Sequence, residues 1–223
     1  MILYKYELSH LDLLTWSAVC ASIICYCASS RTCLNIIRNK STGDVPLFPF
    51  IASLYSGVIW LKYSLMVNSV QYAVANFINT VLQASYIVIY HGYCKDKRKC
   101  HKQLLVFITV LYALLFYAKY YPFNEVVKTL GFFGCFVTIL MTGAPLVSLK
   151  VIIETRSTRI LDFGFIIASF FSNLLWTLAG YYMSDINISL PNGVAFFLAV
   201  FQLSLFVVYP SNNSRINTSE PMV

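Results

Sequence analysis

The sequence predicts an all-α membrane protein whose seven transmembrane helices form two parallel three-helix bundles joined by a linker helix (3+1+3). Composition is the first reason, because apolar residues make up 58% of the chain and charged residues 11%, against roughly 45–50% and about 25% in soluble domains. The second reason is a run of seven long uncharged stretches, and the third is an internal repeat with an offset of 116 positions.

Cutting the chain at every Asp, Glu, Lys and Arg leaves seven long stretches, each of which is expected to hold one transmembrane helix. They are Leu13–Ser30, Val45–Leu61, Tyr63–Cys94, Gln103–Ala118, Thr129–Leu149, Phe163–Ser184 and Ile186–Ser214. A transmembrane helix needs about 17–25 apolar residues. The fourth stretch, Gln103–Ala118, has 16 residues and is therefore the marginal candidate. No small-residue cleavage site follows the first stretch, which is therefore expected to be helix 1 and not a signal peptide.

The distribution of Lys and Arg predicts the orientation. Twelve lie on the side of the first, third and fifth connections and the C-terminal tail: Arg31, Arg38, Lys40, Lys95, Lys97, Arg98, Lys99, Lys102, Lys150, Arg156, Arg159 and Arg215. The other side has four, Lys5, Lys62, Lys119 and Lys128. The positive-inside rule places the N-terminus outside and the C-terminal tail in the cytosol. The stretch CKDKRKCHK is then a cytosolic loop, which is compatible with anionic-lipid contact, and no nucleic-acid partner is expected.

The cysteines do not predict a disulfide framework, because none of the seven falls in an expected external loop. Cys94, Cys100 and His101 lack a second Cys-x-x-Cys partner, so no zinc site is expected. No nucleophile–base arrangement and no glycine-rich phosphate loop is present. The sequence therefore predicts neither an enzyme nor a bound cofactor or metal.

The internal repeat appears first in IASLYSGVIW (Ile51–Trp60) and IASFFSNLLW (Ile167–Trp176). The same offset relates Ser41-Thr42 to Ser157-Thr158 and Asn76 to Asn192. These anchors fall before and within the second and third helices of each copy, so the repeat unit has three helices. Because three is odd, a linker helix is needed to keep the two bundles parallel. The expected units are residues 10–92, the linker 103–120, residues 127–209 and a cytosolic tail 210–223.

Polar side chains lie on one face of the expected second helix of each copy. Ser53, Ser56, Gly57 and Trp60 follow i, i+3, i+4, i+7 spacing, and helix 6 repeats the pattern with Ser169, Ser172, Asn173 and Trp176. Two interpretations stay open at this point. Small residues allow close helix packing and Trp is common at membrane interfaces, whereas the same residues could instead line a cavity.

The expected third helix has its own polar face, formed by Asn76, Asn79, Thr80 and Gln83. An unpaired amide in hydrocarbon costs several kcal/mol, so this face must meet protein or water. Hydrogen bonding between helices and a polar cavity are both consistent with that, and Asn192, beside Pro191, could also mark the start of a helix. Amides and indoles suit a neutral, hydroxyl-rich substrate, and no mid-helix charge is available for an ionic one.

These residues resemble the SWEET family of sugar transporters over roughly residues 10–210. The resemblance is carried by NKST (Asn39–Thr42), Pro49-Phe50, Trp60, Asn76, GAPL (Gly143–Leu146), TRST (Thr155–Thr158), Trp176 and LPNG (Leu190–Gly193). It implies a facilitative uniporter of sugars that works by alternating access around a site between the two bundles.

The resemblance also implies site residues. Trp60, Asn76, Trp176 and Asn192 would bind the sugar, and Cys25, Ser56, Met141 and Ser172 would shape the pocket. The bulk of Met141 favours a monosaccharide. Family prolines in helices 1, 2, 5 and 6 act as gating hinges, and this chain keeps only Pro49 and Pro145, with Ser29 and Phe165 at the paired positions.

Three other functions fit the sequence less well than sugar transport. A heptahelical receptor is disfavoured, because helix 7 has no Lys and no Asp-Arg-Tyr follows helix 3. A proton-coupled PQ-loop-type organellar solute transporter is the main alternative, although the chain has no Pro-Gln dipeptide and no mid-membrane carboxylate. A partner-binding protein without transport is the third. The expected partners are a neutral sugar and the lipid bilayer, association into homo-oligomers stays open, and a plasma-membrane or Golgi/endomembrane location fits equally.

Overall fold

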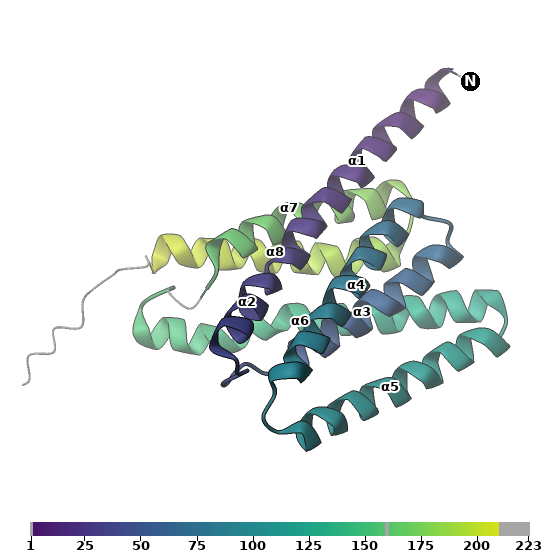
Figure 1. Cartoon of the computed structure of the whole chain (residues 1–223). Coiled ribbons are helices and arrows are strands. Elements are labelled where there is room, and N and C mark those ends of the chain that lie inside the picture. Colours follow the sequence, from purple (N-terminus) through teal and green to yellow (C-terminus); the bar gives the residue numbers. More distant parts are fainter. Residues whose placement is uncertain (1, 159–160, 210–223) are drawn as a thin grey trace, which may run out of the picture.

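The computed structural model describes residues 2–158 and 161–209, with the side chains of 2–9, 144–148 and 150 left aside. This part of the chain folds into helices without strands, which confirms the predicted all-α class (Figure 1). The helices are α1 (Ile2–Cys27), α2 (Ser29–Asn39), α3 (Phe48–Met66), α4 (Val70–Tyr93), α5 (Lys97–Tyr120), α6 (Phe123–Thr155), α7 (Phe163–Tyr182) and α8 (Ile186–Val208).

The first predicted transmembrane helix is interrupted. Its two parts, α1 and α2, meet at Ala28, whereas α6 in the second copy runs without a break through the equivalent Ala144-Pro145. The predicted single membrane span is still present, because His10–Asn39 forms one candidate span that is interrupted at Ala28. A proline within a helix removes a backbone hydrogen bond and favours a kink, yet the interruption lies in the copy that has Ser29 in place of the proline.

The backbone repeats itself where the helices end. Lys40 and Arg156 adopt left-handed conformations with φ of 49° and 48°, and Asn68 and Ser184 do so with φ of 56° and 54°. Each pair is 116 positions apart. A positive φ costs energy in residues other than glycine, so its recurrence at the same offset shows that the copies share turn geometry as well as sequence.

Each copy packs its helices in the same order. The last helix of the unit contacts the other two, so α4 packs on α1 and α3 while α8 packs on α6 and α7. The two bundles meet through α1 against α7 and α3 against α6. In the repeat, α1 corresponds to α6 and α3 corresponds to α7. The α1–α7 and α3–α6 interfaces are therefore equivalent to each other. Helix α5 lies at the edge of this arrangement and contacts α3 and α6 (Figure 1).

Most of the helices are long and apolar enough to cross a membrane. In the described part of the chain these spans are His10–Asn39, α4, α5, Phe123–Gly143, α7 and α8. Helix α3 is not among them, because Lys62 and three serines lower its apolar content. With 19 residues, α3 is still about 28 Å long. Because it packs between α4 and α6, we count it with the six spans above, which gives seven membrane helices among the described residues.

The core is concentrated at one end of the molecule, the closed end, where the α3–α4, α5–α6 and α7–α8 connections lie (Figure 1). There a buried cluster joins both bundles, with Ile59 and Tyr63 from α3, Leu130 from α6 and Ile188 from α8. A second buried cluster lies at the opposite, open end. Its residues come from α2, α3, α4 and α5 and from Leu47 just before α3. The two bundles are thus held together mainly at the closed end.

Candidate functional site: a central cavity between the two bundles

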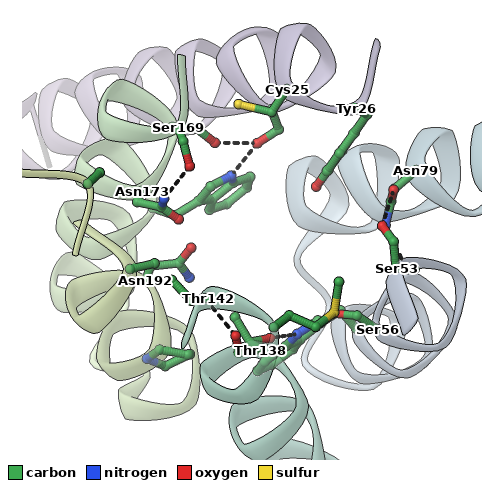
Figure 2. Close-up of a pocket in the computed structure, with 18 of the residues that line it drawn as sticks. Cys25, Tyr26, Ser53, Ser56, Asn79, Thr138, Thr142, Ser169, Asn173 and Asn192 are labelled. Carbon is green, nitrogen blue, oxygen red and sulfur yellow. Dashed lines mark hydrogen bonds between the residues drawn. The ribbon is translucent and has the colours of Figure 1, made fainter. Parts of the chain in front are cut away.

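A cavity of about 290 Å³ lies between the bundles. Its lining comes from six helices: Ser22, Cys25, Tyr26, Ser53, Ser56, Trp60, Tyr72, Asn76, Asn79, Thr138, Met141, Thr142, Phe165, Ser169, Ser172, Asn173, Trp176, Pro191, Asn192, Ala195, Ala199 and Gln202. All eight residues expected to bind or shape the substrate are in this set, so the structure brings them together. Figure 2 shows side chains reaching the cavity from several sides, with Cys25 and Asn79 on different walls.

The lining is arranged in pairs that follow the repeat. The pairs are Ser22 with Thr138, Cys25 with Met141, Tyr26 with Thr142, Ser53 with Ser169, Ser56 with Ser172, Trp60 with Trp176 and Asn76 with Asn192. Each pair is separated by 116 positions. A ligand in this cavity would therefore meet similar chemistry from both bundles.

The two indoles are fixed by equivalent hydrogen bonds across the bundle interface. Nε1 of Trp60 donates to Oγ1 of Thr138 at 3.0 Å, and Nε1 of Trp176 donates to Oγ of Ser22 at 2.8 Å. Ser22 and Thr138 are themselves a repeat pair. A buried indole N–H usually needs such a partner, so each Trp is oriented by the opposite bundle.

Tyr72 closes the cavity at the side of the closed end. Its ring lies between the two indoles, with ring centroids 5.6 Å from Trp60 and 4.7 Å from Trp176. Gly134 allows this arrangement, because a Cβ at that position would come within 2.8 Å of the Trp60 ring. The three aromatic rings form a continuous apolar floor.

The two predicted amides are held in the same way. Nδ2 of Asn76 donates to the carbonyl oxygen of Tyr72 at 2.8 Å, and Nδ2 of Asn192 donates to that of Ile188 at 2.6 Å. Both bonds run back four residues along the helix. They use one amide hydrogen, and among the described residues no hydrogen bond is made by Oδ1 of either side chain. Each Asn can therefore still offer an acceptor and a second N–H to a ligand.

Another pair of amides breaks the sequence repeat but preserves the polarity of the cavity. In the first bundle Asn79 on α4 lies against Gly57 on α3, where an added Cβ would be 2.8 Å from Nδ2. In the second bundle the equivalent positions are Ala195 on α8 and Asn173 on α7. Each bundle thus presents one amide at this level, from α4 in one and α7 in the other. The Asn79 amide is occupied, since Nδ2 donates to the Ser53 carbonyl oxygen at 3.2 Å.

Beyond the aromatic floor, a polar cluster joins the bundles at the closed end. The hydroxyl of Tyr63 donates to the Asp185 carboxylate at 2.8 Å, and Nδ2 of Asn187 donates to the Tyr63 oxygen at 3.0 Å. Tyr63 is 2% exposed. Hydrogen bonds to a charged group contribute roughly 1.5–3 kcal/mol, so this cluster is a strong contact between α3 and the α7–α8 turn.

The open end carries only a weak connection. Arg31 on α2 lies 3.9 Å from Asp162 before α7, with 83% and 54% of the two side chains exposed. Exposed ion pairs contribute about 0–1 kcal/mol. The bundles are therefore joined more weakly here than at the closed end.

Of the two predicted hinge prolines, Pro49 is not among the residues that line the cavity. Pro49 is exposed in the first turn of α3, where a proline costs no helical hydrogen bond. The backbone at Pro145 is helical, and its side chain lies outside the described set. Their hinge role stays a prediction, and the break at Ala28 is a candidate that the sequence did not suggest.

Sequence reasoning did not single out several residues of this site, among them Ser22, Tyr72, Thr138 and Asn173. Ser22 and Thr138 would have been found by extending the repeat comparison to every hydroxyl-bearing position, because they are 116 apart. Asn173 was seen on its helix face but not singled out. Tyr72 gave no signal, because its repeat partner is Ile188.

The chemistry of the lining is neutral. The described residues that line it carry hydroxyls, amides, one thiol, one thioether and aromatic rings, and none of these described residues is Asp, Glu, Lys or Arg. Within the described residues no group of three or more His, Cys, Asp or Glu side chains is placed to hold a metal. Such a site can bind an uncharged molecule through hydroxyl hydrogen bonds and stacking on the indoles.

Comparisons with known proteins agree with this geometry. A sequence model of the family described as "Sugar efflux transporter for intercellular exchange" matches residues 12–98 and 128–214. A Drosophila pseudoobscura pseudoobscura protein named sugar transporter SWEET1 is 32% identical, over 89% of this chain and 89% of its own. A Caenorhabditis elegans protein of the same name is 30% identical, over 95% and 69%.

Two further matches are more distant in sequence. An Arabidopsis thaliana protein named bidirectional sugar transporter SWEET10 is 26% identical over 83% of this chain and 66% of its own. The solved structure of a eukaryotic SWEET transporter is 24% identical and superposes with a TM-score of 0.82, covering 91% of this chain and 99% of that one. The fold, the two matched repeats and the relatives lead to one conclusion: the chain belongs to the SWEET family of sugar transporters.

Proposed function

We propose that this protein carries a neutral sugar across a membrane by facilitated diffusion, binding it in the central cavity and exposing that cavity to each side in turn. The observation that carries this proposal is the cavity itself, where paired indoles and paired amides from the two bundles face one space that is closed at one end. The names of the relatives, sugar transporters in each case and bidirectional in one, support the same function.

The size of the cavity favours a monosaccharide. An apolar cavity of about 150 Å³ holds one benzene ring, so about 290 Å³ suits one six-membered ring with its hydroxyl groups. Tyr72 limits the space at the closed end and Met141 limits it from α6. A second sugar ring would have to displace one of them.

The orientation follows from the Lys and Arg distribution. With the N-terminus outside, the open end faces the cytosol, and the present conformation would load or release sugar there. A tag inserted at residue 2 should be antibody-accessible in intact cells, and a tag at residue 218 should be protected, if the protein is at the plasma membrane. If only the tag at residue 218 were accessible, the orientation would be the opposite of the one proposed.

The units 10–92 and 127–209 are proposed to move relative to each other, with 103–120 as the linker and 210–223 as a cytosolic tail. Loss of the Tyr63–Asp185 contact and closure near Arg31 and Asp162 would give the opposite state. The candidate hinges are Pro49, Pro145 and the break at Ala28. Population of both states requires that they differ by only a few kcal/mol.

The proton-coupled alternative finds no support. Coupling usually needs a carboxylate within the membrane, and the lining has none among the residues that the structure describes. Asp12 accepts a hydrogen bond from the Gln71 amide, and Asp162 caps α7 by accepting from the Phe165 N–H.

Uptake by proteoliposomes tests the proposal. The purified protein is reconstituted, and uptake of labelled hexoses, sucrose and neutral amino acids is compared with that of protein-free vesicles. We expect saturable uptake of at least one hexose, with less for sucrose and none for amino acids. Saturable amino-acid uptake without sugar uptake would contradict the proposed function.

A further inference from the structure

A second hollow lies on the outside of the protein, in the angle between α3, α5 and α6. It has a volume of about 610 Å³, and its walls are almost entirely apolar. Val106 and Val110 of α5 contribute one wall and Leu140 of α6 another, and all three are at least half exposed. We call it the α5 groove. An exposed apolar surface of this kind indicates a site that something apolar covers.

The mouth of the α5 groove is basic. Lys102 and Gln103 line it at the open end of the molecule. Arg98 lies one turn before Lys102, in the same i, i+4 row as Val106 and Val110. Both cations are exposed, and neither is in an ion pair within the described part of the chain. The mouth therefore offers two free positive charges and an amide next to an apolar channel.

The length of the α5 groove matches one leaflet of a bilayer. From Lys102 to Val110 the helix rises about 12 Å, and half of the hydrocarbon core is about 15 Å. The basic mouth would then lie at the level of the lipid headgroups and the apolar part among the acyl chains. Clusters of Lys and Arg at this position of a membrane helix attract anionic lipids.

We propose that the α5 groove is a binding site for an anionic phospholipid, with one acyl chain packed between α5 and α3 and the phosphate held by Lys102 and Arg98. A second copy of this chain is a poorer occupant, because a symmetric contact would bring the same basic residues together. Met141 lines both the α5 groove and the central cavity, so the bound chain would lie against the wall of the substrate site. The proposal rests on the membrane location and is independent of which solute is carried.

Native mass spectrometry of the purified full-length protein tests this inference. The protein in detergent is titrated with phosphatidylserine and, separately, with phosphatidylcholine of the same acyl chains. We expect one saturable phosphatidylserine, bound about ten-fold more tightly than phosphatidylcholine. Dihexanoyl phosphatidylserine, which has the headgroup but only short chains, should bind at least five-fold more weakly. Equal binding of the two headgroups, or of short and long chains, would overturn the proposal.

Variants separate the two halves of the site. The double variant Arg98→Gln/Lys102→Gln should weaken phosphatidylserine binding at least five-fold. Lys95→Gln is the control, because it removes a charge from the same basic segment outside the α5 groove, and it should leave binding within two-fold. Val106→Trp fills the channel without changing charge and should also weaken binding. An equal loss of phosphatidylserine binding in Lys95→Gln would show that the lipid binds to a diffuse basic surface. Cross-linked dimers joined through α5 would show that a second protein copy occupies the α5 groove. Either result refutes the lipid site.

Discussion

The hydroxyls of Ser22 and Thr138 control how the two indoles face the cavity. Each accepts a hydrogen bond from the Trp of the opposite bundle, at 2.8 and 3.0 Å. Losing either acceptor leaves a buried indole N–H unpaired, which costs about 1–3 kcal/mol. The pair therefore links the geometry of the site to the contact between the bundles.

Ser22→Ala and Thr138→Val should weaken sugar transport to a comparable extent. We expect the half-saturation concentration to rise about five-fold in each, because roughly 1 kcal/mol of positioning energy is lost. Ser22→Ala should be the more severe, since Ser22 Oγ also lies 2.9 Å from Ser172 Oγ. Thr109→Val on exposed α5 is the control, because its hydroxyl bonds only to its own helix. Kinetics indistinguishable from Thr109→Val would show that the indoles need no anchoring.

Asn76→Ala and Asn192→Ala should each reduce uptake ten-fold or more. An amide that binds substrate contributes about 0.5–1.5 kcal/mol, and a substrate hydroxyl left unpaired adds about 1–3 kcal/mol. Asn79→Ala is the comparison, because its amide is already bonded to the Ser53 carbonyl oxygen. It should retain more uptake at equal surface expression while losing thermal stability. Suppose Asn79→Ala alone abolishes transport: the Asn76 and Asn192 pair would then be packing residues.

The residues that the sequence could predict are those that recur. Trp60, Asn76 and their partners stand out because polar or bulky side chains are repeated at one offset in an apolar chain. Tyr72 could not be found this way, because its place between the indoles of Trp60 and Trp176 depends on how the two bundles meet. The relation between Asn79 and Asn173 could not be found either. The two amides lie at the same level of the cavity, but they are not at equivalent positions of the sequence repeat.

At the scale of the helices, close contact between α7 and α8 depends on Gly180. A Cβ there would lie 2.6 Å from the backbone nitrogen of Ser189. Because backbone atoms cannot turn aside as a side chain can, the two helices would have to separate. This contact is therefore a tight local constraint on packing within the second bundle.

Gly180→Ala should destabilise the protein by about 1–3 kcal/mol, the usual cost of overpacking. In detergent this should lower the melting temperature by several °C. Gly143→Ala serves as the control, because nothing lies within 4 Å of a Cβ there, and it should leave the melting temperature unchanged or slightly higher. Equal melting temperatures for the two variants would mean that α7 and α8 can move apart at no cost.

Helix positions were predictable from uncharged stretches, whereas their internal shape was not. The spans of α4 to α8 follow from charge spacing and apolar content. A proline would be expected to mark the interrupted helix, but the break lies at Ala28, and Pro145 lies in the continuous helix α6 of the other copy. Membrane helices tolerate prolines where neighbouring groups compensate for the lost hydrogen bond, so only the packed structure decides which copy is interrupted.

At the scale of the whole molecule, the uneven distribution of contacts defines the state of the transporter. The aromatic floor and the Tyr63–Asp185 contact hold the bundles together at the closed end, while an exposed ion pair bridges the other. Because the two copies are parallel, exchanging them leaves the same end closed, so the opposite state requires the two bundles to move relative to each other. Which end is closed in this conformation could not be predicted, since the sequence encodes both states.

The most direct test of this account is the steady-state level of labelled hexose in proteoliposomes with an imposed proton gradient. In the described part of the chain the cavity offers hydroxyls, amides and indoles but no carboxylate to carry a proton. Internal sugar should therefore rise to the external concentration and stop there, with the same final level when the gradient is collapsed. Accumulation above the external concentration that disappears with the gradient would contradict facilitated diffusion, and with it the central claim that this cavity works as a uniporter.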